Sequence, residues 1–179
     1  MAWHQYRDVD FRFRFAKEAS GTDLGESLNV ILISATPISE LRGGIPVAMF
    51  RYDFPWYWAF LIAVAGNMLP IPFLLALYDP VVKLVSRVAW IKRLVEWFFR
   101  YTRRRGGLVE RYGWIGLAIF VGVPLPMTGA WTGSVLAYLM GIEYKRALPA
   151  ILLGVIIAGV IVTVFCALGW ETYLLLKRE

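Results

Sequence analysis

The sequence predicts an all-α integral membrane protein built from two inverted repeats. Each repeat is a re-entrant helical hairpin followed by a transmembrane helix, and a basic amphipathic interfacial helix joins the two. Three observations predict this fold. Of the 179 residues, 59% are hydrophobic and 18% are charged, whereas soluble domains carry about 25% charged residues. Long apolar blocks alternate with short basic stretches. Two of these blocks are interrupted by prolines at their centres, and each is followed by a block long enough to cross a bilayer.

Residues 1–22 form a polar N-terminal arm. The arm has no continuous apolar segment of the kind that a signal peptide needs, so we expect a later segment to direct membrane insertion. Residues 8–15 alternate between charged and apolar side chains, which fits a short strand or an arm on the membrane surface. Disorder explains this segment equally well.

The first apolar block, residues 24–50, is predicted to be a re-entrant hairpin. Its centre holds Pro37, Glu40, Arg42 and a pair of glycines. On insertion scales a charged side chain at the centre of a membrane helix costs about 2.5 to 3.5 kcal/mol. Non-helical backbone survives at membrane depth only where protein or water covers it. We therefore expect a half-helix over residues 24–36, a break at Pro37 and a half-helix returning to about residue 50.

A transmembrane helix over residues 56–78 completes the first repeat, residues 23–79. Tryptophan and tyrosine residues lie at its two ends, as in the aromatic belts at membrane interfaces. Asn67, Pro70 and Pro72 interrupt its second half. Because proline removes a helical hydrogen bond, these residues predict a kink.

Residues 80–112 are predicted to form the basic amphipathic linker. Apolar side chains recur at helical spacing on one stripe, and lysines and arginines lie on the other side. Such a helix lies in the membrane interface with its basic side chains reaching the headgroups. We interpret its charges as a solvated face or a topology signal rather than a specific lipid site.

The second repeat, residues 113–176, has the same order of elements, and residues 177–179 form a C-terminal tail. Its hairpin covers residues 114–142, and its transmembrane helix covers residues 147–170. Pro124 corresponds to Pro37, and Gly154 corresponds to Asn67. If each hairpin returns to its own side, the second repeat is inverted, as in many transporters. The alternative is a bundle of four plain spanning helices with incidental prolines.

Polar residues at the two breaks form the candidate site. Half-helices begin after each break, and their N-terminal N–H groups point toward it. Glu40 is a candidate proton-coupling carboxylate, and Arg42 suits an anionic substrate group. The alternative is a structural Glu40–Arg42 pair that locks the hairpin. The predicted substrate- and ion-binding residues are Glu40, Arg42, Pro37, Asn67, Pro124, Pro126, Thr128, Gly129 and Thr132. Trp131 is expected to be a packing residue.

The composition argues against an intramembrane enzyme, a metal site or a cofactor. The only histidine is His4 in the polar arm, so no membrane histidine is present to act as a catalytic base. Asp53 and Asp79 lie at the ends of the predicted spans rather than inside them. Cys166 is the only cysteine, which excludes an intramolecular disulfide. The net charge of +6 is distributed between membrane segments, so we expect contact with anionic lipid rather than nucleic acid.

Residues 34–46 and 123–133 together resemble the family called putative small multidrug export proteins. The resemblance covers roughly residues 28–170. That family in turn looks like a relative of the DedA membrane proteins, which share two opposed re-entrant hairpins. DedA-type proteins are implicated in proton-coupled flipping of polyprenyl phosphates and phospholipids. The resemblance implies that Glu40 matches the acidic residue of the first hairpin and Arg42 the basic residue beside it.

The second hairpin departs from the DedA pattern. Where those proteins place arginines around the prolines, this sequence has Val123, Leu125, Met127 and Thr128. Arg42 is therefore the only cation expected deep in the membrane.

These features predict a multi-pass plasma-membrane transporter whose partners are membrane lipids. Its expected substrate is a lipid or an amphipathic anion, such as the polyprenyl phosphate or phospholipid that the resemblance to DedA proteins implies, and proton coupling is expected. A row of small residues at Gly129, Gly133 and Ala137 lets helices approach closely, which also predicts a homodimer. One alternative is an exporter of lipophilic cations, which would need a carboxylate but not Arg42. Another is a membrane scaffold without transport activity.

Overall fold

The computed structural model describes residues 24–85, 107–124 and 128–176. This part of the chain is helical and contains no strand, which confirms the all-α class for the described residues. The predicted N-terminal arm, most of the basic linker, Pro126 and the C-terminal tail lie outside them.

The first predicted hairpin consists of α2 (Leu24–Ala35) and α3 (Glu40–Pro46), and α3 continues into the short π-helix η1 (Val47–Arg51). Residues 36–39 separate the two helices. The Ile33 carbonyl near the end of α2 accepts both the Thr36 hydroxyl, at 2.8 Å, and the Thr36 backbone N–H, which caps the last turn of the helix. The break therefore falls at Pro37, where the sequence predicts it.

The predicted first span is divided into α4 (Trp56–Met68) and α5 (Ile71–Val85). They join at residues 69 and 70, inside the segment where the prolines predict a kink. The 23 residues from Trp56 to Tyr78 are long and apolar enough to cross a membrane. Helix α5 extends to Val85, so it covers the first residues of the predicted linker.

The remaining helices are α7 (Gly107–Tyr112), α8 (Trp114–Gly122), α9 (Ala130–Leu139) and α10 (Tyr144–Leu176). Helix α10 is longer at both ends than the predicted 147–170. The Glu143 carbonyl accepts bonds from the amides of Arg146 and Ala147, so the helix is already wound before Pro149. Its residues Tyr144–Gly169 form the second apolar stretch long enough to cross a membrane.

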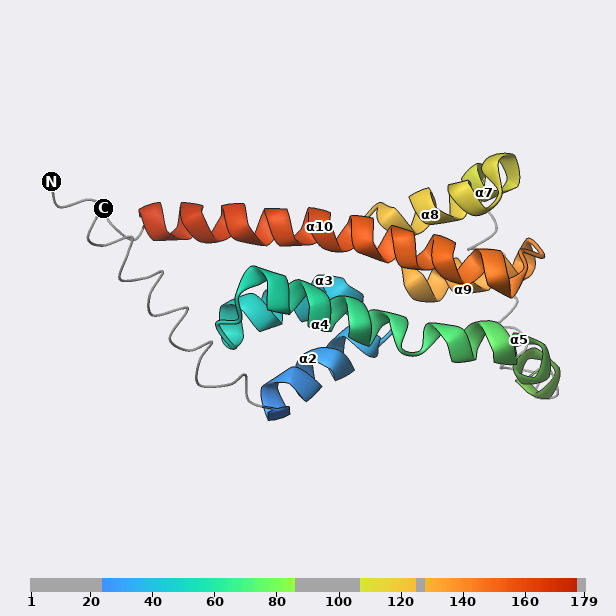
Figure 1. The fold of residues 1–179 in the computed structure, drawn as a ribbon, viewed down its shortest axis with the longest axis horizontal. Coiled ribbons are helices and arrows are strands. Elements are labelled where there is room, and N and C mark those ends of the chain that lie inside the picture. Colours follow the sequence, from blue (N-terminus) through green and yellow to red (C-terminus); the bar gives the residue numbers. More distant parts are fainter. Residues whose placement is uncertain (1–23, 86–106, 125–127, 177–179) are drawn as a thin grey trace, which may run out of the picture.

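Helix α10 runs along the molecule, and the two hairpins approach its middle from opposite ends (Figure 1). The hairpin of α2 and α3 comes from the end where α10 finishes. The hairpin of α8 and α9 comes from the end where α10 begins. Their breaks therefore meet near the middle of the molecule.

Glycines allow each hairpin to pack closely against the long helix that follows it in the chain. A Cβ atom on Gly66 of α4 would lie 2.7 Å from the carbonyl oxygen of Ile31 in α2. A Cβ atom on Gly154 of α10 would lie 2.7 Å from the carbonyl oxygen of Ala118 in α8. Both distances are shorter than van der Waals contact, so glycine is required at both positions.

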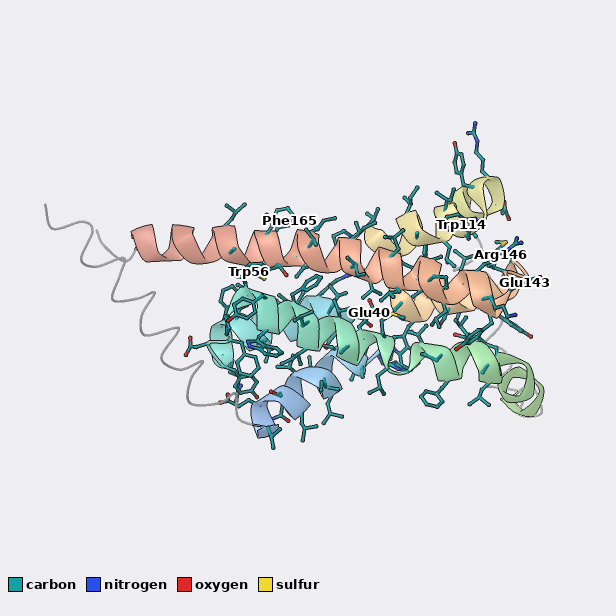
Figure 2. The ribbon with its side chains drawn as sticks, in the orientation of Figure 1. Glu40, Trp56, Trp114, Glu143, Arg146 and Phe165 are labelled. Atoms are coloured by element: carbon teal, nitrogen blue, oxygen red, sulfur yellow. The ribbon has the colours of Figure 1, made fainter. Side chains whose placement is uncertain are left out.

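Large apolar side chains are exposed over much of the outer surface. Along α10 they are Leu152, Leu153, Ile156, Ile157, Val160, Val164, Phe165 and Leu168. Phe165, which is labelled on this helix in Figure 2, is among the most exposed of them. A continuous apolar surface of this kind marks contact with lipid or with another protein.

Candidate functional site

The two breaks meet at Glu40, the first residue of α3. Its side chain is buried, with 6% of its surface exposed, and it lies between the hairpins in Figure 2. The Trp131 backbone N–H, in the first turn of α9, faces the Glu40 Oε1 atom at 3.4 Å. The carboxylate therefore lies at the N-terminus of α9, where the helix dipole favours negative charge. Glu40 has a φ of 49°, which is unusual for a residue with a side chain.

Gly129 provides the space that the Glu40 carboxylate occupies. A Cβ atom on Gly129 would lie 1.9 Å from Oε2 of Glu40 and 2.5 Å from its Cδ. Gly129 also has φ 153° and ψ −166°, a backbone region that is essentially restricted to glycine. Both the packing and the backbone conformation therefore exclude a side chain here.

Arg42 forms a second link between the hairpins. Its guanidinium Nη2 donates to the Thr128 carbonyl and lies 3.3 Å from the Thr128 hydroxyl. That hydroxyl donates to the Val123 carbonyl at 2.8 Å, which holds the ends of the second break together. Arg42 and Glu40 are also close enough for electrostatic attraction. Both charged side chains thus contact the second hairpin.

Trp131 forms a third link. Its indole N–H donates to the Ala35 carbonyl at 3.1 Å, and Ala35 is the last residue of α2. A carbonyl at a helix C-terminus has no partner within its own helix, and the indole supplies one. Trp131 therefore contacts both sides of the first break, Ala35 before it and Glu40 after it.

A cavity of about 420 Å³ lies beside these links. Among the described residues that line it, Arg42 carries the charge. The other lining residues come from η1, the second break and the C-terminal half of α10: Phe50, Pro124, Val162, Phe165, Cys166 and Gly169. Phe50 and Phe165 are exposed on the surface. An apolar wall with one guanidinium suits a ligand that combines an apolar body with an anionic group.

The structure brings Glu40, Arg42, Thr128 and Gly129 together and places Pro124 in the wall of the adjoining cavity.

Three other predicted site residues do not line this cavity. Pro37 is exposed at the tip of its hairpin. Asn67 is buried in α4, and its amide nitrogen and oxygen have no hydrogen-bond partner. The Thr132 hydroxyl donates to the Gly129 carbonyl at 3.3 Å. Pro126 lies outside the described residues.

Sequence reasoning missed the role of Trp131 and the wall that α10 contributes to the cavity. One signal was available for Trp131. It follows Gly129 by two residues, as Arg42 follows Glu40, and both side chains reach a backbone carbonyl of the opposite hairpin. The cavity residues of α10 carry no such signal, because they resemble any apolar span.

One comparison with known proteins finds a match. The model of the family described as "Putative small multi-drug export protein" matches residues 40–161. This range begins at Glu40 and includes the second break and the first half of α10. No curated protein and no solved structure matches the chain.

Proposed function

The chain belongs to the putative small multi-drug export protein family, and from that premise we propose that it is a multi-pass plasma-membrane transporter of an amphipathic anion. Glu40 couples transport to protons, and Arg42 binds the anionic group of the substrate. The family supplies the transporter-like role. The cavity beside Arg42 supports the charge and shape of the substrate.

The surface supports placement in a membrane. Two apolar stretches, Trp56–Tyr78 and Tyr144–Gly169, are long enough to cross a bilayer. Exposed apolar side chains cover the outer side of α10, where lipid tails would be the solvent.

Matching contacts support two inverted repeats. In the first repeat, Gly66 packs on Ile31 and Ser34; in the second, Gly154 packs on Ala118 and Val121. The pairs 31 and 118, 34 and 121, and 66 and 154 are all separated by 87 or 88 residues, like the prolines at 37 and 124. The hairpins also point in opposite directions in Figure 1. Inverted repeats of this kind place their binding site where the broken helices meet.

The substrate assignment rests on one observation: Arg42 provides the charge in an otherwise apolar cavity. A lipophilic cation would be repelled by the guanidinium at short range, and a lipid phosphate would be attracted. A polyprenyl phosphate or a phospholipid, as the resemblance to DedA proteins implies, fits this chemistry.

The position of Glu40 supports proton coupling. As a carboxylate it stabilises the N-terminus of α9, and protonation would remove the charge that the helix dipole favours. The link between the hairpins would weaken, so the two tips could separate. Proton binding and hairpin movement would then be coupled.

Cys166 allows a direct test of the substrate charge, because it is the only cysteine and lines the cavity. The rate of Cys166 labelling by a maleimide is measured in nonionic detergent with dodecyl phosphate or dodecyltrimethylammonium, which differ in head charge. We expect dodecyl phosphate to protect Cys166, and Arg42→Gln to abolish this protection. Arg51→Gln, which changes an exposed arginine, is the matched control. Protection by the cation alone would favour the alternative export of lipophilic cations.

The coupling role is tested in vesicles that contain the purified chain. Movement of a fluorescent phospholipid analogue is followed with and without a pH gradient. We expect Glu40→Gln to remove the dependence on the gradient, whereas Glu143→Gln, at an exposed site, keeps it. An unchanged pH dependence in Glu40→Gln would rule out Glu40 as the coupling group. Movement no faster than in empty vesicles, for every variant, would favour the membrane scaffold.

A further inference from the structure

We propose that Tyr78, Ser134 and Tyr138 form a closed gate over a second substrate passage. The cavity beside Arg42 lies on one side of the hairpin breaks, and this gate lies on the other side. This inference rests on the inverted repeats of the proposed function and adds the route by which substrate leaves the site.

The three residues tie α5 to α9. The Tyr78 hydroxyl lies 2.9 Å from the Ser134 hydroxyl oxygen. Ser134 in turn donates to the Trp131 carbonyl at 2.7 Å, and because a hydroxyl has a single proton, Tyr78 is the donor in the first bond. The rings of Tyr78 and Tyr138 are stacked, with centroids 5.2 Å apart. This chain of hydrogen bonds therefore ends at Trp131, the residue that links the two hairpins.

The repeats assign counterparts to five of the seven described residues that line the cavity. Shifted back by 88 residues, Val162, Phe165 and Cys166 in α10 become Leu74, Leu77 and Tyr78 in α5. Across the breaks, Pro124 corresponds to Pro37 at the repeat spacing. Arg42 is matched to Trp131 by its contact, because each side chain donates to a backbone carbonyl of the opposite hairpin. The repeats therefore specify a second passage between α5 and α9, bordered by Trp131 and by the exposed tip at Pro37.

Cys166 and its counterpart Tyr78 differ in whether the passage beside them is open or closed. Cys166 lines an open cavity, whereas its counterpart Tyr78 is bonded and stacked onto α9. One passage is thus open while the other is shut, as two repeats in different conformations would produce.

The two passages lie at opposite ends of the fold. The cavity uses the C-terminal half of α10, and α5 and α9 lie beside its N-terminal half (Figure 1). Exchange of the two conformations between the repeats would close the cavity and open the gate. A substrate bound at the breaks would then face the other side of the membrane.

Removing the Tyr78 hydroxyl tests the gate without disturbing the stack. A neutral hydrogen bond of this type changes an equilibrium by roughly twofold to twelvefold, so Tyr78→Phe should raise the open population of the gate about fivefold. Ser134→Ala removes the same bond from the other side and is the second variant. Tyr144→Phe, at an exposed position of α10, is the matched control.

The readout is maleimide labelling of the full chain without substrate. One reporter is the native Cys166; the other is Leu74→Cys in a Cys166→Ala background. We expect Tyr78→Phe and Ser134→Ala to raise the labelling rate at position 74 about fivefold while labelling of Cys166 stays level or falls. Equal rises at both positions would indicate general loosening and overturn the proposal, as would an unchanged rate at position 74. Because no substrate is present, a wrong substrate class leaves this result intact, and a failed gate leaves the protection of Cys166 intact.

Discussion

Gly129→Ala should be one of the most damaging single-methyl changes in the protein. Two effects add. The alanine must adopt φ 153° and ψ −166°, which costs about 1 to 3 kcal/mol. Its Cβ atom would also lie 1.9 Å from Oε2 of Glu40, so the carboxylate must leave the N-terminus of α9. Loss of a charge-assisted hydrogen bond costs about 1.5 to 3 kcal/mol. The expected destabilisation is therefore about 2.5 to 6 kcal/mol.

The assay is unfolding by SDS in mixed micelles, followed by tryptophan fluorescence. Gly141→Ala is the matched control, because Gly141 also has a positive φ of 66° but a Cβ atom there meets no atom within 4 Å. This control measures the cost of a positive φ without a collision. The excess at Gly129 therefore combines its more restricted backbone conformation with the displacement of Glu40.

A double variant decides whether the reasoning is right. Glu40→Ala removes the carboxylate with which the new methyl group collides. Gly129→Ala should therefore cost clearly less in the Glu40→Ala background than in the wild type, because the two residues are in contact. If the two changes are additive within about 0.5 kcal/mol, the collision does not control the stability of the breaks and the argument fails.

Three further variants can be measured in the same SDS titration. Gly154→Ala should destabilise the protein by about 1 to 3 kcal/mol, because its Cβ atom would lie 2.6 Å from a side-chain atom of α8. The control Gly169→Ala, whose Cβ atom meets no atom within 4 Å, should be neutral or stabilising. Equal effects of the two changes would contradict the close packing of α8 on α10. Trp131→Phe should cost about 1 kcal/mol, because the Ala35 carbonyl loses the indole N–H, and an unchanged midpoint would show that this link is not stabilising. Thr128→Val should cost a similar amount, about 1 kcal/mol, through loss of the bond that closes the second break; no loss would mean that the break is held by backbone contacts alone.

The positions of the breaks could be predicted from the sequence because they depend on local chemistry. Proline cannot continue the hydrogen-bonding of a helix, and charged residues exclude a plain lipid-facing span. These rules place the first break at Pro37 and the second at Pro124, and the described helices end on either side of each break. The helical class follows from the same local information.

Contacts across the breaks could not be predicted in the same way. The sequence identifies Glu40 and Arg42 as unusual, but it does not give the distance to Thr128 or Gly129, which lie far away along the chain. The repeat correspondence also shows a small error with a large effect. The predicted partner of Gly154 is Asn67, whereas the contacts match Gly154 with Gly66. One residue rotates a helix position by about 100°, so a register error of this size changes which face of α4 is matched to Gly154.

The links between the hairpins also constrain the order of events during synthesis. Glu40 and the Ala35 carbonyl receive their partners from Trp131, which is 91 residues beyond Glu40 in the chain. At typical ribosomal rates of about 5 to 20 residues per second, these partners emerge roughly 5 to 18 seconds later. During that interval the first hairpin holds a carboxylate and a helix end without their native contacts. Unpaired polar groups are costly in the bilayer core. We therefore expect the first hairpin to remain in water or in the insertion machinery until the second hairpin is synthesised, and the two hairpins to enter the bilayer together.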